Sequence, residues 1–224
     1  MLLPALSPPL PPRLRRPAKL LGFCALGYAL FWATSALGIL GASAWAREQV
    51  PTGGTVAGIH HFERVDDRVW RGSAPGPEGY RELARRGVHT VVDLRAEDLT
   101  PRQLAQPQRA GLTAVRLPIR DGQTPAAAQV DAFLATVRGA DGPVFVHCGA
   151  GVGRTGSMAA AYLVRTGQAT ARAAALRTVA VGPPSIEQIY YAATAERHES
   201  EQPPALVRAV SRLADAPRRI SSYL

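Results

Sequence analysis

The stretch from Pro143 to Thr166 constrains the fold more than any other part of this 224-residue chain. An apolar, β-branched run, PVFVH, leads directly into Cys148, and three of the next five residues are glycine. A segment suited to a helix follows, and Gly167 ends it. Such runs are typical of buried strands, and a buried strand joined to a helix is the repeating unit of α/β folds. We therefore expect Cys148 at the carboxyl end of a strand, where open α/β sheets bind ligands.

The chain on either side continues this alternation. The predicted strands are Val69–Trp70, Val88–Leu94 and Leu112–Leu117. The predicted helices are Glu78–Arg86, Ala126–Arg138 and residues 170–180, 185–199 and 204–214. Thr124 is the predicted N-cap of the Ala126–Arg138 helix, with Pro125 at N1. Residues 100–110 are expected to form a poor helix that is broken by Pro107. The pattern predicts an α/β fold, a three-layer sandwich whose central, mostly parallel sheet is flanked by helices.

An uncharged run precedes this domain. Residues 20–46 contain no charged side chain, and the run exceeds the roughly 20 residues that a helix needs to cross a membrane. We expect a transmembrane signal-anchor; the small-x-small triplets Ala42–Ala44 and Ala44–Ala46 leave a cleaved signal peptide as the alternative. The predicted segments are a disordered, basic, Pro-rich tail (1–19), the anchor (20–46), a linker (47–58), the globular domain (59–199) and a C-terminal helical extension (200–224).

Much of the excess basic charge lies beside this run. The formal net charge is +9, and four cations precede the run with no acid among them: Arg13, Arg15, Arg16 and Lys19. Only Arg47, next to Glu48, follows it directly. This asymmetry predicts a single-pass protein with its N-terminus inside and its domain outside the cytoplasm, or a secreted domain if the run is cleaved. The domain has no dense stripe of arginines interleaved with aromatic residues, so nucleic acid is not an expected partner.

The cysteines and histidines give no metal-site pattern. Cys24 lies inside the uncharged run, so Cys148 has no partner in the domain, which excludes a disulfide framework. His60 and His61 are adjacent but have no third ligand at a matching spacing, and we interpret them as the edge of the linker. We predict no metal and no cofactor.

The loop after Cys148 is suited to hold an anion. Its glycines allow the backbone N–H groups to turn inward, and the following helix adds its free N–H groups and the positive end of its dipole. Arg154 offers a planar fork to two phosphoryl oxygens. The same field favours the thiolate of Cys148, which is the nucleophilic form. The predicted substrate-binding residues are Gly149, Ala150, Gly151, Val152, Gly153 and Arg154.

The stretch His147–Gly156 resembles the His-Cys-x5-Arg-Ser/Thr signature of the protein tyrosine phosphatase superfamily. The small domain resembles the dual-specificity branch of that superfamily, more loosely over Phe62–Ala193. The resemblance implies metal-independent hydrolysis of phosphomonoesters through a phosphocysteine formed on Cys148, with Arg154 holding the phosphoryl oxygens.

The same resemblance implies roles for the two residues that flank this pair. Thr155 would stabilise the thiolate as it leaves phosphorus. His147 would orient the backbone of the cysteine and tune its ionisation; a core histidine with satisfied hydrogen bonds is the alternative.

A general acid has to come from another loop. Leu117–Pro125 resembles the Pro-x-x-Asp-Gly-x-Thr-Pro loop of the kinase-associated phosphatase group, which assigns the acid to Asp121. An aspartate that caps its own turn is the alternative. Asp98 and Asp93 are rivals, but Asp93 lies inside a predicted buried strand and is expected to pair with Arg95 or a loop amide.

Two weaker candidates rest on partial resemblance. Trp70–Pro75 resembles a strand–loop entry of small bacterial relatives, in which Arg71 or Ser73 would line the pocket; a structural turn is the preferred interpretation. Gln188 resembles a glutamine that positions water in some relatives, but a solvated helix glutamine is preferred.

The predicted partners are a phosphorylated protein or a small phosphomonoester, and the membrane through the N-terminal helix. Phosphotyrosine is the first expected substrate, followed by phosphoserine and phosphothreonine. Highly charged inositol phosphates and phosphoinositides are disfavoured, because the signature loop contains no lysine. The alternatives are a phosphate-binding pseudophosphatase module and a rhodanese-like sulfur transferase. The five-residue spacer, the Arg–Thr pair and the Asp121 loop favour phosphate chemistry over sulfur transfer.

Overall fold

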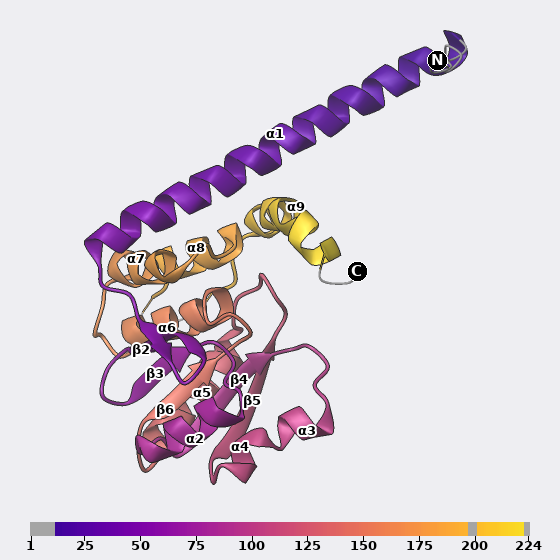
Figure 1. Cartoon of the computed structure of the whole chain (residues 1–224). Helices are drawn as coiled ribbons and strands as arrows, with labels where there is room; N and C mark the ends of the chain where they lie inside the picture. Colours follow the sequence, from indigo (N-terminus) through magenta and orange to yellow (C-terminus); the bar gives the residue numbers. More distant parts are fainter. Residues whose placement is uncertain (1–11, 197–200, 222–224) are drawn as a thin grey trace.

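The computed structural model describes residues 12–196 and 201–221. Six strands form one mixed sheet in the order β1-β2-β3-β6-β4-β5 (Figure 1). The strands are β1 (Gly54–Val56), β2 (Ile59–Arg64), β3 (Val69–Gly72), β4 (Thr90–Arg95), β5 (Thr113–Ile119) and β6 (Val144–His147). Strands β3, β6, β4 and β5 pair in parallel, and β1 and β2 pair antiparallel at one edge. The α/β class and the mostly parallel sheet predicted from the sequence are confirmed.

Helices cover both faces of this sheet. On one face lie α5 (Ala127–Gly139) and α6 (Gly153–Arg165), backed by α7 (Ala171–Val181) and α8 (Ile186–Ala193). The other face is covered by α2 (Pro77–Arg85). Strand β6 supplies both cores, since Val144 and Val146 face α5 and α6 whereas Phe145 faces α2. A strand buried on both faces is apolar at every position, which explains the continuous run in the sequence.

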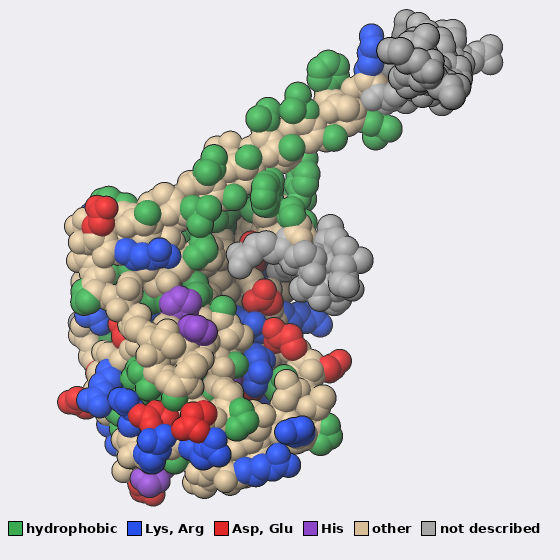
Figure 2. Space-filling model, in the orientation of Figure 1, with side chains coloured by type: hydrophobic (Ala, Val, Ile, Leu, Met, Phe, Trp, Pro, Cys, Tyr) green, Lys and Arg blue, Asp and Glu red, His purple; other side chains and the backbone are tan. Residues whose placement is uncertain are grey.

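The first described element is a long apolar helix, α1 (Pro12–Gln49), which extends past the body of the molecule (Figure 1). By length and composition its Lys19–Gln49 part, with a mean hydropathy of 1.7, suits either a membrane span or a signal sequence. Apolar side chains project from much of its length (Figure 2). Its last turns pack on α7, where Ala46 is fully buried beside Val179 and Ala180. The helix is therefore joined to the domain by packing and not only by the chain.

The N-terminal boundaries differ from those predicted. Residues 12–19 of the expected tail belong to α1, and residues 1–11 lie outside the described part. The expected linker, 47–58, instead holds the end of α1 and strand β1. Strands β1 and β2 were not predicted, because their glycines and histidines give no apolar alternation. Their pairing is supplied by β3 and by the buried side chains of Ile59 and Phe62.

Within the domain the predicted elements match the observed ones, with two local corrections. The N-cap of α5 is Ala126 and not Thr124, and the side-chain oxygen of Gln129 accepts from the backbone N–H of Ala126. The 100–110 stretch forms two short helices, α3 (Pro101–Leu104) and α4 (Gln106–Arg109), and Pro107 lies in the first turn of α4 and not at the break. The remaining described element is α9 (Ala205–Ser221), in the expected C-terminal extension.

Candidate active site

The loop from Cys148 to Gly153 joins β6 to α6 at the carboxyl edge of the parallel strands. Cys148 is buried, with 3% of its surface exposed, and the backbone N–H of Gly151 donates to its Sγ at 3.3 Å. Gly151 has φ +76°, and a Cβ there would lie 2.4 Å from the carbonyl carbon of Gly72. Both facts require glycine. The sulfur thus lies in a tight loop that opens onto a pocket, at the positive end of α6.

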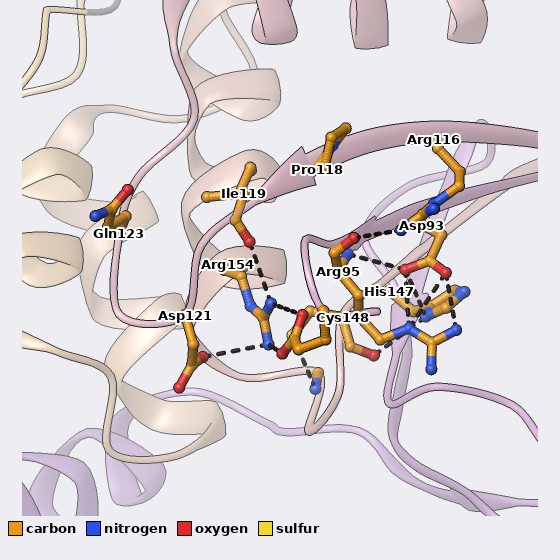
Figure 3. A network of polar contacts seen from close by, with 12 residues as sticks. Asp93, Arg95, Arg116, Pro118, Ile119, Asp121, Gln123, His147, Cys148 and Arg154 are labelled. Carbon is orange, nitrogen blue, oxygen red and sulfur yellow. Dashed lines mark hydrogen bonds and ion pairs between the residues drawn. The ribbon is translucent and has the colours of Figure 1, made fainter. Parts of the chain in front are cut away.

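Arg154 reaches across this pocket from the first turn of α6. Its Nη1 and Nη2 donate to the two carboxylate oxygens of Glu97, at 2.7 and 2.8 Å, and Nη1 also donates to the carbonyl of Ile119 at 3.2 Å (Figure 3). The hydrogen bonds from Arg154 lower the pKa of Glu97, although partial burial opposes them. Glu97 follows β4 and was not a sequence candidate, because an exposed glutamate in a loop carries no local signal of its partner. A phosphoryl group that uses both terminal nitrogens has to compete with this carboxylate.

Asp121 lies opposite the cysteine loop and points toward Arg154 (Figure 3). Its Oδ1 is 3.2 Å from Nη2 of Arg154, and its side chain is 74% exposed at the pocket rim. Of the aspartates proposed as acids, the structure brings Asp121 to this pocket. Asp98 does not line it. Asp93 pairs with Arg95 through Oδ2 and Nη2 at 2.8 Å, as predicted.

His147 lies fully buried beneath the loop. Its Nδ1 donates to the carbonyl of Cys148 at 3.1 Å and lies 4.0 Å from Oδ1 of Asp93. Burial lowers the pKa of His147 to about 4, and the negative charge of Asp93 only partly opposes this. The ring is therefore neutral at pH 7 and holds the backbone of the cysteine by a hydrogen bond.

Thr155 follows Arg154 in the buried first turn of α6. Its hydroxyl is fully buried and makes no hydrogen bond to another described residue, so the structure does not bring it into a hydrogen bond with Sγ. A buried hydroxyl without a partner is costly.

Arg71, on β3, contacts the same loop and is not among the residues that line the pocket. It is 2% exposed, and its Nη2 donates to the carbonyls of Gly151 at 2.7 Å and Val152 at 3.4 Å. Burial lowers the pKa of Arg71, whereas the charges of Glu63 and Cys148 oppose that shift. The sequence interpretation placed Arg71 or Ser73 in the pocket or in a turn. Arg71 instead binds the backbone of the loop through these two carbonyls. Ser73 lies directly after β3, and its Oγ accepts from the backbone N–H of His60 at 2.8 Å.

Gln188 was expected to be a solvated helix residue, and this expectation is wrong. It is 2% exposed and lines the pocket, and its Nε2 donates to the carbonyl of Gln123 at 2.9 Å. A Cβ on Gly153 would overlap its side-chain oxygen, so the two residues lie in close contact. His61, which was interpreted as the edge of the linker, contacts the cysteine loop, since its Nδ1 donates to the carbonyl of Ala150 at 2.9 Å. Both contacts depend on chain segments far apart in the sequence. Among the described residues, His, Cys, Asp and Glu side chains form no group of three or more suited to a metal ion.

Comparison with known proteins finds a family and several proteins that are similar to this domain. Residues 67–168 match the family described as "Polymorphic toxin system, DSP-PTPase phosphatase". Human dual specificity protein phosphatase CDC14C is 42% identical over 96 residues, which are 42% of this chain and 21% of that protein. NAD kinase 2, chloroplastic, of Arabidopsis thaliana is 38% identical over 95 residues, which are 40% of this chain and 10% of that protein. The chain thus spans a tenth to about a fifth of the length of these curated relatives.

Two solved structures share the fold. P. aeruginosa TpbA in complex with pTyr gives a TM-score of 0.52 at 22% identity, over 73% of this chain and 94% of that one. The core catalytic domain of the PP-IP phosphatase SIW14 from S. cerevisiae gives 0.53 at 17% identity, over 70% and 92%. At these identities the likeness concerns the fold alone. The part of the chain that contains Cys148 is thus similar to the DSP-PTPase phosphatases over residues 67–168, and it shares the fold of these two solved structures.

Proposed function

We propose that this phosphatase hydrolyses phosphomonoesters through a phosphocysteine intermediate on Cys148. The observation that carries the proposal is the placement of its Sγ at the base of a loop, with the N–H of Gly151 aimed at it and Arg154 beside it. Cations and the positive end of a helix favour the thiolate, which is the attacking form. The same donors suit the equatorial oxygens of a phosphoryl group in flight.

In the first step the thiolate attacks phosphorus, forming the S–P bond as the ester P–O bond breaks. The departing oxygen takes a proton from Asp121, which lies across the pocket. Arg154 exchanges its contacts with Glu97 for phosphoryl oxygens during this step. His147, which donates to the carbonyl of Cys148, holds the nucleophile in place.

In the second step water attacks phosphorus and the S–P bond breaks. The Asp121 carboxylate takes a proton from the water, phosphate leaves, and the sulfur returns as a thiolate. Thr155 supports the departing sulfur with its buried hydroxyl, which has no partner among the described residues. Gln188, at the wall of the pocket, lies where the water enters.

The proposed substrates are phosphotyrosine first and then phosphoserine or phosphothreonine of proteins. The loop after Cys148 would bind one phosphoryl group with one arginine, Arg154. The carboxylates of Glu97 and Asp121 pair with this arginine, and Asp215 lines the same pocket. These carboxylates oppose substrates with several phosphates. The pTyr bound by TpbA agrees with this order of preference.

We further propose that α1 is a retained membrane anchor, with the N-terminus inside and the phosphatase domain outside the cytoplasm. Both small-x-small triplets lie within the helix, and Ser43 and Ala46 are buried against the body of the protein. Cleavage after Ala46 would remove these packed residues. This packing supports an anchor over a signal peptide.

The test uses the full-length protein in detergent, with p-nitrophenyl phosphate and EDTA. Cys148→Ser should abolish turnover, and Arg154→Ala should lower kcat/KM by about 100-fold or more. Asp121→Asn should flatten the fall of activity on the basic side of the pH profile, because a protonated acid is no longer required. If the unmodified protein binds phosphate analogues through Arg154 without turnover, it is a binding module. Transfer of sulfur from thiosulfate to cyanide would instead indicate the sulfur transferase.

A further inference from the structure

The loop that carries Asp121 is tied down by residues that come much later in the chain. Every residue from Gly122 to Pro125 has a hydrogen bond to one of them. The contacts are Ser185 Oγ to the Gly122 carbonyl (2.8 Å), Gln188 Nε2 to the Gln123 carbonyl (2.9 Å), Thr124 Oγ1 to Gln202 Oε1 (3.2 Å) and Gln202 Nε2 to the Pro125 carbonyl (2.7 Å). The loop therefore has little freedom to move independently of the C-terminal third of the chain.

Gln202 is the outermost of these ties and uses both ends of its amide. The oxygen accepts from the Thr124 hydroxyl while the nitrogen donates to the next carbonyl, so the two contacts fix the orientation of the amide. Thr124 itself is 6% exposed, so its side of the first contact is buried, whereas Gln202 lies at the surface. The second contact is with the carbonyl of Pro125, the residue before Ala126, which is the N-cap of α5.

The segment that carries Gln202 is itself anchored. Pro203, the next residue, is buried. Further on, Ser211 of α9 is 1% exposed, and its Oγ accepts from the backbone N–H of Glu187 in α8 at 3.1 Å. Asp215, one turn later, reaches the rim of the pocket. The C-terminal segment is thus a fixed wall of the site, and it lies beyond the family match, which ends at residue 168.

We propose that Gln202 is a positioning residue that holds the general acid, Asp121, in place over the phosphoryl group. The inference rests on the proposed role of Asp121. The Asp121 side chain is 74% exposed and pairs with Arg154 at 3.2 Å, so burial does not fix it, and where it lies over the pocket also depends on the backbone of its loop. The contacts of Gln202 hold that backbone three and four residues after Asp121.

The leaving group separates this role from a general effect on folding. Phenyl phosphate releases a phenol with a pKa of about 10, like that of tyrosine, and needs the acid. The weakly basic phenolate of 2,4-dinitrophenyl phosphate leaves without a proton. Loss of the acid, or of its position, therefore slows the first substrate and spares the second.

The experiment compares kcat/KM for both substrates in the full-length protein in detergent. Asp121→Asn should lower the phenyl phosphate value by about 100-fold or more. Gln202→Ala should lower it by about 10-fold, and Thr124→Val, which removes one of the two contacts, by a smaller factor in the same direction. Both loop variants should leave 2,4-dinitrophenyl phosphate within about 2-fold. Glu201→Ala, at the exposed neighbouring position, is the matched control and should change neither substrate.

Three results would overturn the inference in distinguishable ways. If Gln202→Ala slows both substrates equally, the residue only maintains the fold. If it slows neither while Asp121→Asn shows the leaving-group effect, the acid is held by other contacts. If Asp121→Asn itself shows no leaving-group effect, the assignment of the acid fails, and the role of Gln202 fails with it.

Discussion

The loop after β6 and the loop after β5 face each other across the pocket, but they are held in different ways. The cysteine loop, 148–153, is fixed by its own glycines, by the helix it enters and by the buried Arg71 beneath it. The Asp121 loop, in which Asp121 is exposed and Thr124 is buried, is fixed by side chains 63 to 78 residues later in the chain. The proposed nucleophile thus depends mainly on one continuous segment with Arg71 as an added support, whereas the loop of the proposed acid depends on several contacts with distant side chains. The loops should therefore fail differently when mutated.

The largest effect is expected from Gly151→Ala. The new methyl group would meet the backbone of Gly72 and Ser73 at 2.4 to 2.5 Å, at a positive φ that alanine rarely adopts. We expect loss of about 2 kcal/mol or more of the free energy of unfolding and nearly all activity. Thermal unfolding and kcat/KM measure both.

The matched control is Gly149→Ala. Its Cβ would meet only Nη2 of Arg154, at 3.8 Å, without a positive φ. An unchanged melting temperature is expected for this variant. Equal destabilisation by both substitutions would show that Gly151 does not pack against the backbone of Gly72 and Ser73 as closely as the structure indicates.

The buried His147, which precedes the cysteine loop, should also make the stability of the protein depend on pH. The pKa of His147 is lowered from 6.5 to about 4, so the unfolded chain binds a proton between these values that the folded chain does not. The stabilisation is complete above pH 6.5 and is lost as the pH falls through the folded pKa, a loss of about 3 kcal/mol.

His147→Asn removes this titration and retains an amide donor for the Cys148 carbonyl. Urea unfolding between pH 7 and pH 4 should therefore show a shallower loss of stability in the variant. Parallel curves for the two proteins would mean that the histidine titrates alike in both states.

Arg71→Met tests the support beneath the cysteine loop. The substitution removes a buried cation and the hydrogen bonds to the carbonyls of Gly151 and Val152. We expect iodoacetamide to alkylate Cys148 about 10-fold more slowly at neutral pH, because a buried cation that interacts with the sulfur is lost. Arg71→Lys, which keeps the charge, should recover part of the rate. Alkylation at the original rate in Arg71→Met would show that Arg154 and the helix suffice.

The smallest effect concerns the Asp121 loop alone. Ser185 caps α8 and donates to the Gly122 carbonyl, whereas Thr170 caps α7 in the same way without touching that loop. Ser185→Ala and Thr170→Ala should each cost about 1 kcal/mol of stability. Only Ser185→Ala should also slow phenyl phosphate relative to 2,4-dinitrophenyl phosphate, by about 3-fold. A similar kinetic change in both would trace it to lost stability and not to the loop.

The local parts of the fold were predictable because their signals are local. Strand β6, the glycine loop and α6 follow one another without a break, and α2 begins at Pro77 and ends two residues before Gly87. Strands β1 and β2 carry no such pattern. They form because Ile59 and Phe62 find a core that other segments create.

By itself, the sequence determined the α/β class and the family resemblance, and it singled out Cys148 and Arg154 as the proposed reactive pair, because a strand, a cysteine, a glycine loop and an arginine lie within a dozen residues. The tertiary structure decided which distant groups surround that pair: Glu97 on Arg154, Arg71 under the loop, Gln188 in the pocket wall and Gln202 on the Asp121 loop. These side chains are ordinary surface types in the sequence. Their contacts arise only when the sheet and its helices bring segments 57 to 80 residues apart into hydrogen-bonding distance.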